Sequence, residues 1–513
     1  MAVKIILLVL FFGLMVGVGI VCRKKAADVH GFVLGGRNVG PWLTAFAYGT
    51  SYFSAVIFVG YAGQFGWKFG VASTWIGLGN AMIGSLLAWT LLGRRTRIMT
   101  QHLRSATMPQ FFETRFDSRG LKFFSSLIIF VFLIPYTASL YNGLSRLFGM
   151  AFDVDYTVCI VVMAVLTAVY VIVGGYMATA VNDFIQGIIM LFGIVAIVVS
   201  VLKINGGFAG SLDALARITD EAGSSTPGVF ASFFGPDPVG LLSVVKLTSL
   251  GTWGLPQMVQ KFYAIKSEND IHKGTVISTV FAIVVAGGCY FLGGFGRLFD
   301  IDVGTQGYDA VIPEMLSKLS PVICGIALIL VLSASMSTLS SLVLTSSSTL
   351  TLDFIAPVLM KDRDNEKKKL LIIRIFIAVF IAVSAVIAVV QYKLNVTFIA
   401  QLMGLSWGAL AGSFLAPFLY GLYWKRTTKQ ACAVCFVWGS ALMLANMFFK
   451  PYFPSFLQSP INCGALAMLG GMVIVPLVSI ITRRPDKELT DSVFACYDKK
   501  VLAPVKDVLG EED

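Results

Sequence analysis

Apolar residues dominate the chain in long runs that short polar segments separate. A run of about twenty apolar residues is long enough to cross a bilayer as a helix. A membrane barrel would instead show alternating segments of about ten residues, which the sequence lacks. The runs predict an all-α polytopic membrane protein of about thirteen spans, near 3–22, 41–66, 71–93, 121–149, 154–175, 181–204, 238–260, 274–296, 320–350, 371–391, 396–423, 430–449 and 461–482.

Composition supports this prediction, because 57% of the 513 residues are hydrophobic and only 13% are charged. A soluble protein would carry about a quarter charged residues. The net charge of +11 would suit nucleic acid, but the basic residues gather in alternate loops, as at 23–25 and 94–97. This is the positive-inside pattern. It predicts a multi-pass protein of the cell membrane with its N-terminus outside, its C-terminus inside and no nucleic-acid partner. Lys261 is assigned to one of the inner loops.

The spans divide the chain into successive segments. The sequence has no G-x-x-x-x-G-K-[ST] motif, so the protein is expected to use a gradient or to conduct passively. The polar segment from Arg483 is expected to be mobile. The expected segments are an extra helix and inner loop at 1–40, five spans at 41–204, an outer loop at 205–237, five more spans at 238–423, two extra helices at 424–482 and a cytoplasmic tail at 483–513.

Two spans carry helix-breaking residues midway. The second span has Gly49, Thr50 and Ser51 in its middle, and the seventh has Gly254 followed by Pro256. Irregular backbone at membrane depth is tolerated where it lines a cavity. Matching interruptions at the start of two groups of five spans predict a 5+5 inverted repeat with a transport site at the midplane. Loose glycine-rich helix packing is the alternative.

The ninth span carries an excess of hydroxyl groups. Ten of the sixteen residues at 333–348 are serine or threonine. Ala334, Ser337, Thr338 and Ser341 fall at helical spacing and form one stripe. Neutral hydroxyl and carbonyl oxygens are hard ligands, and a set without carboxylates favours a monovalent cation.

Asp183 and Lys246 are two of the charged residues that fall within spans. An intramembrane acid is a candidate for function, so Asp183 is either part of a site or a cap at the start of its span. Lys246 either lines a cavity or extends its ammonium group to the interface.

Four segments together resemble the sodium/solute symporter family, which includes bacterial sodium/proline symporters. They are MSTLSSLVLTSSSTLTLDFI at 336–355, VGGYMATAVNDFIQGIIM at 173–190, YGLYWKRTTKQA at 420–431 and GLPQMVQKFYAIKS at 254–267. The last matches the proline-carrier pattern G-Q-P-H-x-x-x-R-F-x-A, with Leu255, Gln257 and Lys261 as replacements. The resemblance covers nearly the whole chain and implies a leucine-transporter-type fold.

The resemblance also implies binding residues. A first sodium ion would take the carbonyls of Thr50, Phe53 and Ala334 with the hydroxyls of Ser337 and Thr338. A second would take Asp183, Ser337, Ser340 and Ser341. The solute would lie near Tyr52, Ser54, Thr252, Trp253 and Gln257, with Tyr61, Gln64, Gln401 and Trp407 as further candidates along the path.

Sequence differences from known carriers restrict the expected identity of the solute. Proline carriers have an aspartate where this chain has Tyr52, and a tryptophan and a tyrosine where it has Thr248 and Thr252. The arginine of sialic acid carriers is also missing from the third core helix. An amino-acid-like solute or a small carboxylate is favoured.

The expected function is sodium-coupled import of a small organic solute by alternating access, without a chemical reaction. Sodium, the solute and lipid would be the partners, and no cofactor is expected. Proton coupling, a solute sensor on a transporter scaffold and a passive channel remain alternatives. The oligomeric state is open, a monomer included.

Overall fold

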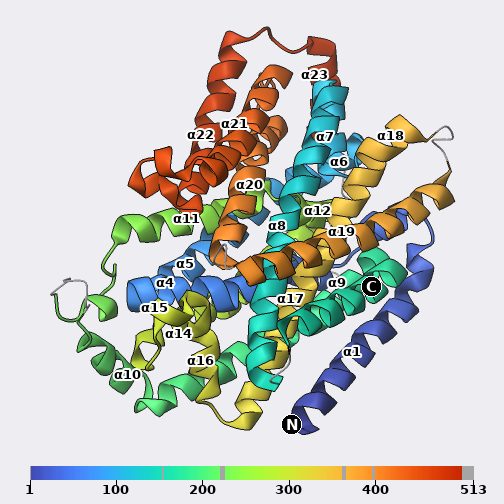
Figure 1. The fold of residues 1–513 in the computed structure, drawn as a ribbon. Helices are drawn as coiled ribbons and strands as arrows, with labels where there is room; N and C mark the ends of the chain where they lie inside the picture. Colours follow the sequence, from blue (N-terminus) through green and yellow to red (C-terminus); the bar gives the residue numbers. More distant parts are fainter. Residues whose placement is uncertain (1, 153–154, 220–225, 361–364, 395–398, 499–513) are drawn as a thin grey trace, which may run out of the picture.

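In the computed structural model the chain is built from helices (Figure 1). The structure describes residues 2–152, 155–219, 226–360, 365–394 and 399–498. Within these ranges the only extended pairing is one parallel bridge between Val39 and Ile265. The prediction of an all-helical chain is confirmed.

The helices of the first half are α1 (Ala2–Cys22), α2 (Val29–Leu34), α3 (Pro41–Tyr52), η3 (Val56–Tyr61), α4 (Ala62–Phe69), α5 (Thr74–Gly79), η5 (Asn80–Leu87), η6 (Trp89–Gly93), α6 (Arg94–His102), α7 (Met108–Phe116), α8 (Arg119–Phe152) and α9 (Tyr156–Ile204). Those of the second half are α10 (Gly207–Ala216), α11 (Pro238–Gly254), α12 (Pro256–Ala264), α13 (Glu268–Ala282), η8 (Ile283–Gly287), α14 (Gly288–Gly293), α15 (Val303–Gln306), α16 (Val311–Ser317), α17 (Pro321–Thr349), η11 (Leu350–Ile355), α18 (Ala356–Leu359), α19 (Glu366–Leu394), α20 (Ile399–Tyr423), α21 (Lys429–Phe448), α22 (Pro460–Ile481) and α23 (Lys487–Phe494). Short 3-10 turns connect several of them.

Nine helical stretches of the described residues are long and apolar enough to cross a membrane. Two of them are longer than a single membrane crossing requires, because Val56–His102 has 47 residues and Tyr156–Ile204 has 49. A helix of 49 residues is about 74 Å long, whereas the hydrocarbon core is about 30 Å thick. Gly175, with φ 56° and ψ −154°, interrupts α9, so α9 has the length for both spans predicted there. The count of thirteen stays a prediction.

Large apolar side chains point outward from the peripheral helices. Phe192 on α9 is 75% exposed, Val386 on α19 is 62% exposed and Ile481 on α22 is 83% exposed. Soluble proteins rarely expose continuous apolar surface of this kind. The chain is a multi-pass membrane protein, and these faces meet lipid.

The hydroxyl-rich helix α17 lies inside the bundle, packed against α3, α8, α9 and α19 (Figure 1). Every residue from 330 to 349 is buried. Some of its hydroxyls donate to carbonyls of the preceding turn, as Ser335 Oγ does to Val331 O at 2.8 Å. Such back-bonding lets a hydroxyl be buried at small cost. Other hydroxyls of α17 instead face neighbouring helices and form the site described below.

Both predicted helix interruptions are present. α3 ends at Tyr52, Phe53 is extended with φ −85° and ψ 120°, and a π-helical turn follows from Val56. The break therefore lies slightly after the Gly49–Ser51 sequence that predicted it. α11 ends at Gly254, Leu255 is extended, and Pro256 begins α12. Proline suits a first helical position because it has no N–H group to leave unpaired.

The two interrupted helices are held together at one end. Val39, before α3, donates its N–H to Ala264 O at 3.2 Å, and Lys266 N–H donates to Val39 O at 3.0 Å. Arg37 adds a hydrogen bond from Nη1 to Tyr263 O at 3.1 Å. These bonds fix the end of α12 beside the start of α3, and so bring the charged residue of α12 close to α17.

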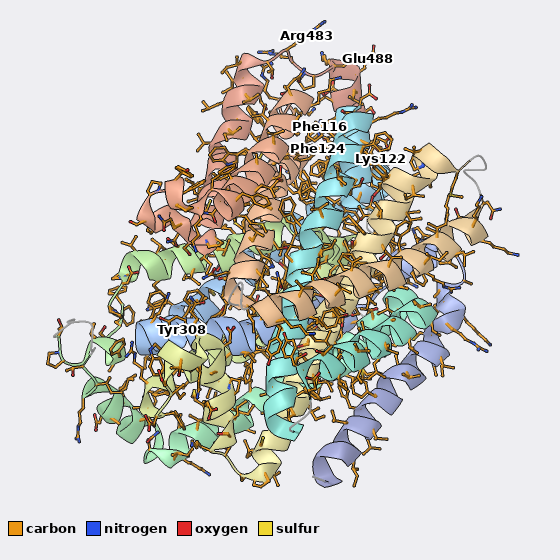
Figure 2. The ribbon with its side chains drawn as sticks, in the orientation of Figure 1. Phe116, Lys122, Phe124, Tyr308, Arg483 and Glu488 are labelled. Atoms are coloured by element: carbon orange, nitrogen blue, oxygen red, sulfur yellow. The ribbon has the colours of Figure 1, made fainter. Side chains whose placement is uncertain are left out.

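The tail was expected to be mobile, and this is wrong for residues 487–497. They form α23 and a 3-10 turn, with Val493, Phe494 and Cys496 buried. The Arg115 guanidinium lies 4.9 Å from the centre of the Phe494 ring. Figure 2 places Glu488 of this segment at the same end of the molecule as Phe116 of α7. A short apolar stripe among many charges produced the helix, and residues 499–513 lie outside the described ranges.

Candidate ion and solute site

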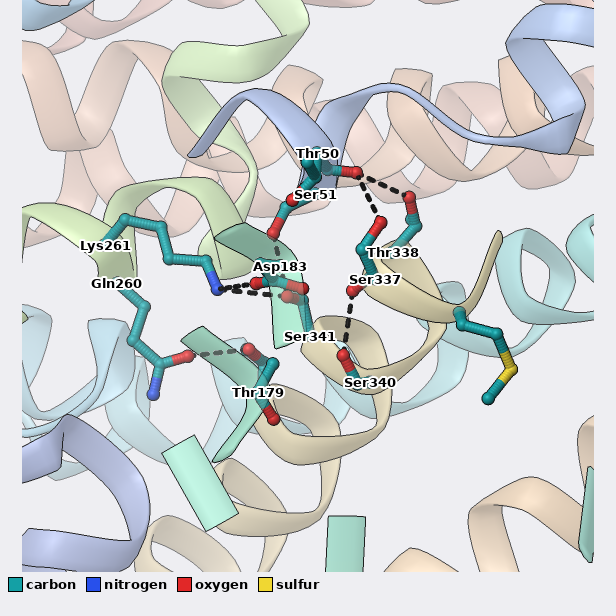
Figure 3. Close-up of polar contacts among 12 residues, drawn as sticks. Thr50, Ser51, Thr179, Asp183, Gln260, Lys261, Ser337, Thr338, Ser340 and Ser341 are labelled. Atoms are coloured by element: carbon teal, nitrogen blue, oxygen red, sulfur yellow. Dashed lines mark hydrogen bonds and ion pairs between the residues drawn. The ribbon is translucent and has the colours of Figure 1, made fainter. Parts of the chain in front are cut away.

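The end of α3 presents unpaired carbonyl groups to α17. A helix leaves its last four carbonyls without intrahelical partners, and its C-terminus carries partial negative charge. Thr50 O accepts hydrogen bonds from Ser337 Oγ at 3.1 Å and from Thr338 Oγ1 at 3.0 Å (Figure 3). Phe53 O lies 3.2 Å from Thr338 Oγ1. The helix break is what exposes these carbonyls to a neighbouring helix.

The facing side of this group comes from one turn of α17. Ala334 O lies 3.0 Å from both Ser337 Oγ and Thr338 Oγ1. All five residues predicted for the first sodium ion therefore converge, and all are buried. We call Thr50, Phe53, Ala334, Ser337 and Thr338 the first cluster. Each hydroxyl has one proton to donate, so only two hydrogen bonds at a time can be donated to the three carbonyls. The remaining oxygen lone pairs suit a cation of low charge.

A second group of polar residues lies one turn further along α17. Ser341 Oγ lies 2.8 Å from Ser51 Oγ and accepts a hydrogen bond from Lys261 Nζ at 3.0 Å. The same Nζ lies 3.7 Å from Asp183 Oδ2 (Figure 3). We call Ser51, Asp183, Lys261 and Ser341 the second cluster. It joins α3, α9, α12 and α17.

The second cluster differs from the set predicted for a second sodium ion. Asp183 and Ser341 both lie beside the Lys261 ammonium group, but Ser340 Oγ donates to Ser337 O at 2.9 Å. The hydroxyl of Ser337 is turned toward the first cluster. The structure thus brings together two of the four predicted ligands and adds a cation.

Lys261 does not lie in a solvated inner loop, as its position at the end of an apolar run suggested. Only 2% of the residue is exposed, because the break at Leu255 starts a new helix whose first turns stay inside the bundle. A lone lysine in the otherwise uncharged stretch 254–264 was the available signal. An intramembrane charge calls for a partner of opposite sign, and Asp183 was the candidate.

The residues predicted for the solute divide into two groups. Tyr52 and Thr252 line a common cavity with Phe53 and Asn80, and its volume of about 10 Å³ has room for about one water molecule. Thr252 Oγ1 donates to Gly84 O at 3.0 Å. A solute would need the surrounding helices to move apart before it could enter here.

The other solute candidates lie outside this cavity lining. Trp253 donates its indole N–H to Ile83 O at 2.9 Å, which is a packing role. Gln257 is buried, and in the described part of the chain both polar atoms of its amide lack a hydrogen-bond partner, which is costly unless a ligand pairs with them. Trp407 lies beside Tyr52, with ring centres 5.8 Å apart.

The geometry does not decide the role of several further candidate residues. Ser54, Tyr61 and Gln64 are buried, whereas Gln401 is partly buried. Lys246 is also partly buried on α11, which fits either of its two predicted roles.

A second buried carboxylate serves structure. Asp353, on η11, accepts hydrogen bonds from Thr107 Oγ1 at 2.6 Å and from Gln110 Nε2 at 2.8 Å. Thr107 also caps the start of α7. Both carboxylate oxygens are paired, so Asp353 fastens α7 to the end of the hydroxyl-rich helix.

Interrupted helices around a buried, oxygen-rich site define a membrane carrier. The sodium:solute symporter family matches residues 32–439, and the chain belongs to this family. The osmoregulated proline transporter OpuE of Bacillus subtilis is 29% identical over 497 residues, which cover 95% of this chain and 96% of the relative. A sodium/proline symporter of Staphylococcus aureus is also 29% identical, over 99% of this chain and 96% of its own length.

Solved structures of transporters share the fold. A sodium-coupled sialic acid symporter in a substrate-bound outward-open state has a TM-score of 0.73 at 16% identity and covers 94% of this chain and 99% of its own. The nucleobase-cation-symport-1 transporter Mhp1, in a closed conformation, has a TM-score of 0.50 at 14% identity, with 90% and 97% covered. At these identities the likeness concerns architecture alone.

Proposed function

We propose that the protein imports a small organic solute together with sodium, by alternating access. The convergence of the five oxygens of the first cluster is the observation that carries the proposal. These groups come from the broken end of α3 and from α17, two elements that are far apart in the sequence. A sodium ion bound between them would tie one interrupted helix to the hydroxyl-rich helix.

The transport cycle follows from this geometry. Sodium binding from outside would order the backbone at the break in α3, next to Tyr52 and the small cavity. The ordered backbone would complete the solute site, and the loaded carrier would turn inward and release both. Each sodium ion gains roughly 2.3 kcal/mol per 100 mV of membrane potential. No bond is made or broken, so the activity is transport and not catalysis.

We place this cycle on thirteen spans with a 5+5 inverted repeat, the N-terminus outside and the C-terminus inside. The breaks in α3 and α11–α12 support the repeat, because each opens one of the two expected groups of five. The basic residues of α6 and its surroundings would then face the cytoplasm. Cysteine labelling from each side of the membrane at Lys68 and Arg94 tests this orientation, since only Lys68 would be reached from outside.

The solute is best matched by an amino-acid-like molecule or a small carboxylate. Two relatives of the chain are proline carriers, which supports this size and charge. The unpaired amide of Gln257 offers one donor and one acceptor near the start of α12. Tyr52, Ser54, Thr252 and Trp253 complete the proposed site around the two breaks. The replacements at Tyr52 and Thr252 leave proline itself as one candidate among several.

The thermal stability of the purified protein tests the proposal even though the solute is unidentified. It is measured in sodium and in potassium against amino acids, short carboxylates, sugars and vitamins. A solute that stabilises the protein only in sodium is the expected result, because ligands that bind the folded state raise its stability. Equal curves in sodium and potassium with every solute would overturn sodium coupling and point to proton coupling.

A further inference from the structure

The positive charge beside Asp183 is the ammonium group of a lysine side chain, Lys261. Lys261 and Asp183 are both buried, and Nζ lies 3.7 Å from Oδ2. The Lys261 ammonium also lies 5.1 Å from the centre of the Tyr176 ring, a favourable position for a cation. A carboxylate, a hydroxyl and an aromatic face therefore surround this ammonium group from α9 and α17.

Asp183 has the environment of a cation ligand and not that of a structural carboxylate. Neither of its oxygens has a hydrogen-bond partner among the described residues, whereas both oxygens of Asp353 do. A buried charge without hydrogen bonds is retained when it is paired with an opposite charge. The ion pair with Lys261 supplies that charge in the described structure.

We infer that the ammonium group of Lys261 is the resident cation of the second cluster, so that the carrier binds one sodium ion, in the first cluster alone. This inference rests on the proposed function and sets its ion stoichiometry. An ammonium group carries the same charge as sodium and contacts the same kinds of oxygen. Because the lysine is covalently attached to α12, this charge is not delivered to the cytoplasm in a transport cycle.

The lysine also connects the two interrupted helices. Its ammonium donates to Ser341 Oγ, which leaves the Ser341 proton free to donate to Ser51 Oγ. Ser51 is adjacent to Thr50 of the first cluster. The contact chain from α12 through α17 to α3 therefore ends beside the proposed sodium ion, so both helix breaks are tied to the same turn of α17.

Equilibrium binding of radioactive sodium to the purified full-length protein tests the inference. The wild type is expected to bind about one sodium ion per chain, since occupancy cannot exceed the number of available sites. Lys261→Ala removes the ammonium and leaves room beside Asp183, so it is expected to bind about two. Lys261→Ala combined with Asp183→Asn is expected to return to about one. Lys266→Ala, which changes an exposed lysine just after α12, is the matched control and should keep the wild-type value.

The outcomes separate this inference from the proposed function. Two sodium ions per wild-type chain would overturn the inference and leave sodium coupling intact. One ion in both the wild type and a folded Lys261→Ala variant would show that the second cluster is no cation site, and would also overturn it. Absence of sodium binding in the wild type would overturn the proposed function. If Lys261→Ala does not fold, Lys261→Ser, which keeps a small polar side chain on α12, takes its place in the same comparison, and two sodium ions per wild-type chain would still overturn the inference.

Discussion

The two polar clusters of α17 differ in whether they contain charged side chains. The first cluster holds five neutral groups, three carbonyls and two hydroxyls, and the hydrogen bonds that join them involve no charged side chain. The second cluster holds an aspartate together with a lysine. Both lie between α17 and α3, about one helical turn, or roughly 5.4 Å, apart. The same helix can thus present one site for a mobile cation and another for a fixed one.

Breaking the charge pair should give the largest effect. Removing one partner of a buried ion pair costs about 3–5 kcal/mol, because the other charge is left unpaired. Asp183→Asn is therefore expected to destabilise the protein and to abolish sodium-driven uptake, and the double variant Asp183→Asn with Lys261→Ala is expected to recover much of both. Thermal unfolding and uptake into vesicles measure this. A double variant as damaged as the worse single variant would contradict the pairing.

The lysine variant sharpens this test, because sodium should replace the missing ammonium. Lys261→Ala is expected to be unstable in potassium and to be restored by sodium, whereas Asp183→Asn should not be restored. Thermal unfolding at matched ionic strength in the two salts compares them. Equal behaviour of the two variants in sodium would argue against a cation position beside Asp183.

Removing one hydroxyl from the first cluster should give the next largest effect. Thr338→Ala deletes an oxygen that contacts Thr50, Phe53 and Ala334, and a lost buried polar partner costs about 1–3 kcal/mol. That corresponds to a rise of about five- to 150-fold in the sodium concentration for half-maximal binding. Ser335→Ala is the control, because its hydroxyl bonds only to Val331 O in its own helix. Unchanged sodium dependence in Thr338→Ala would remove the first-cluster assignment.

Neutralising the structural carboxylate should affect stability and leave ion binding unchanged. Asp353→Asn replaces one acceptor oxygen with an N–H donor, so one of the two hydrogen bonds to the start of α7 is lost, and a hydrogen bond to a charged acceptor is worth about 1.5–3 kcal/mol. The variant should unfold at a lower temperature and keep its sodium affinity within about twofold. A large loss of sodium affinity would mean that Asp353, too, communicates with the ion site.

The smallest effect is expected for Ser340. Its hydroxyl bonds to Ser337 O and not to the second cluster, so Ser340→Ala should change sodium binding by less than about twofold. The steepness of sodium activation should also stay the same. A lower Hill coefficient in this variant would instead support Ser340 as a ligand of a second sodium ion.

The residues of the first cluster could be predicted because two local patterns and the family resemblance pointed to the same segments. Helical spacing places Ala334, Ser337 and Thr338 on one face of α17, and Gly49, followed by Thr50 and Ser51, marks the break that frees the carbonyls. The family resemblance then aligned the two segments. Neither pattern depends on the depth of a residue in the membrane.

The same patterns could not predict every residue of the second cluster. Hydropathy placed the end of the seventh span at residue 260, one residue before Lys261, and so assigned the lysine to a loop. Its depth is set by the break at Leu255 and by the bonds that hold α12 to Val39, which are tertiary features. The helix α23 was missed for a related reason, since its short apolar stripe is stabilised by packing against residues far away in the sequence, such as Arg115.

Sodium-driven uptake into vesicles that contain only this protein tests the central claim most directly. Labelled proline and a panel of amino acids and short carboxylates are offered under an inward sodium gradient, and under equimolar choline at the same pH. We predict that one solute accumulates above its outside concentration only with sodium, in Ser335→Ala as in the wild type, and with much weaker sodium dependence in Thr338→Ala. Equal accumulation in choline, or sodium dependence that Thr338→Ala leaves unchanged, would contradict it.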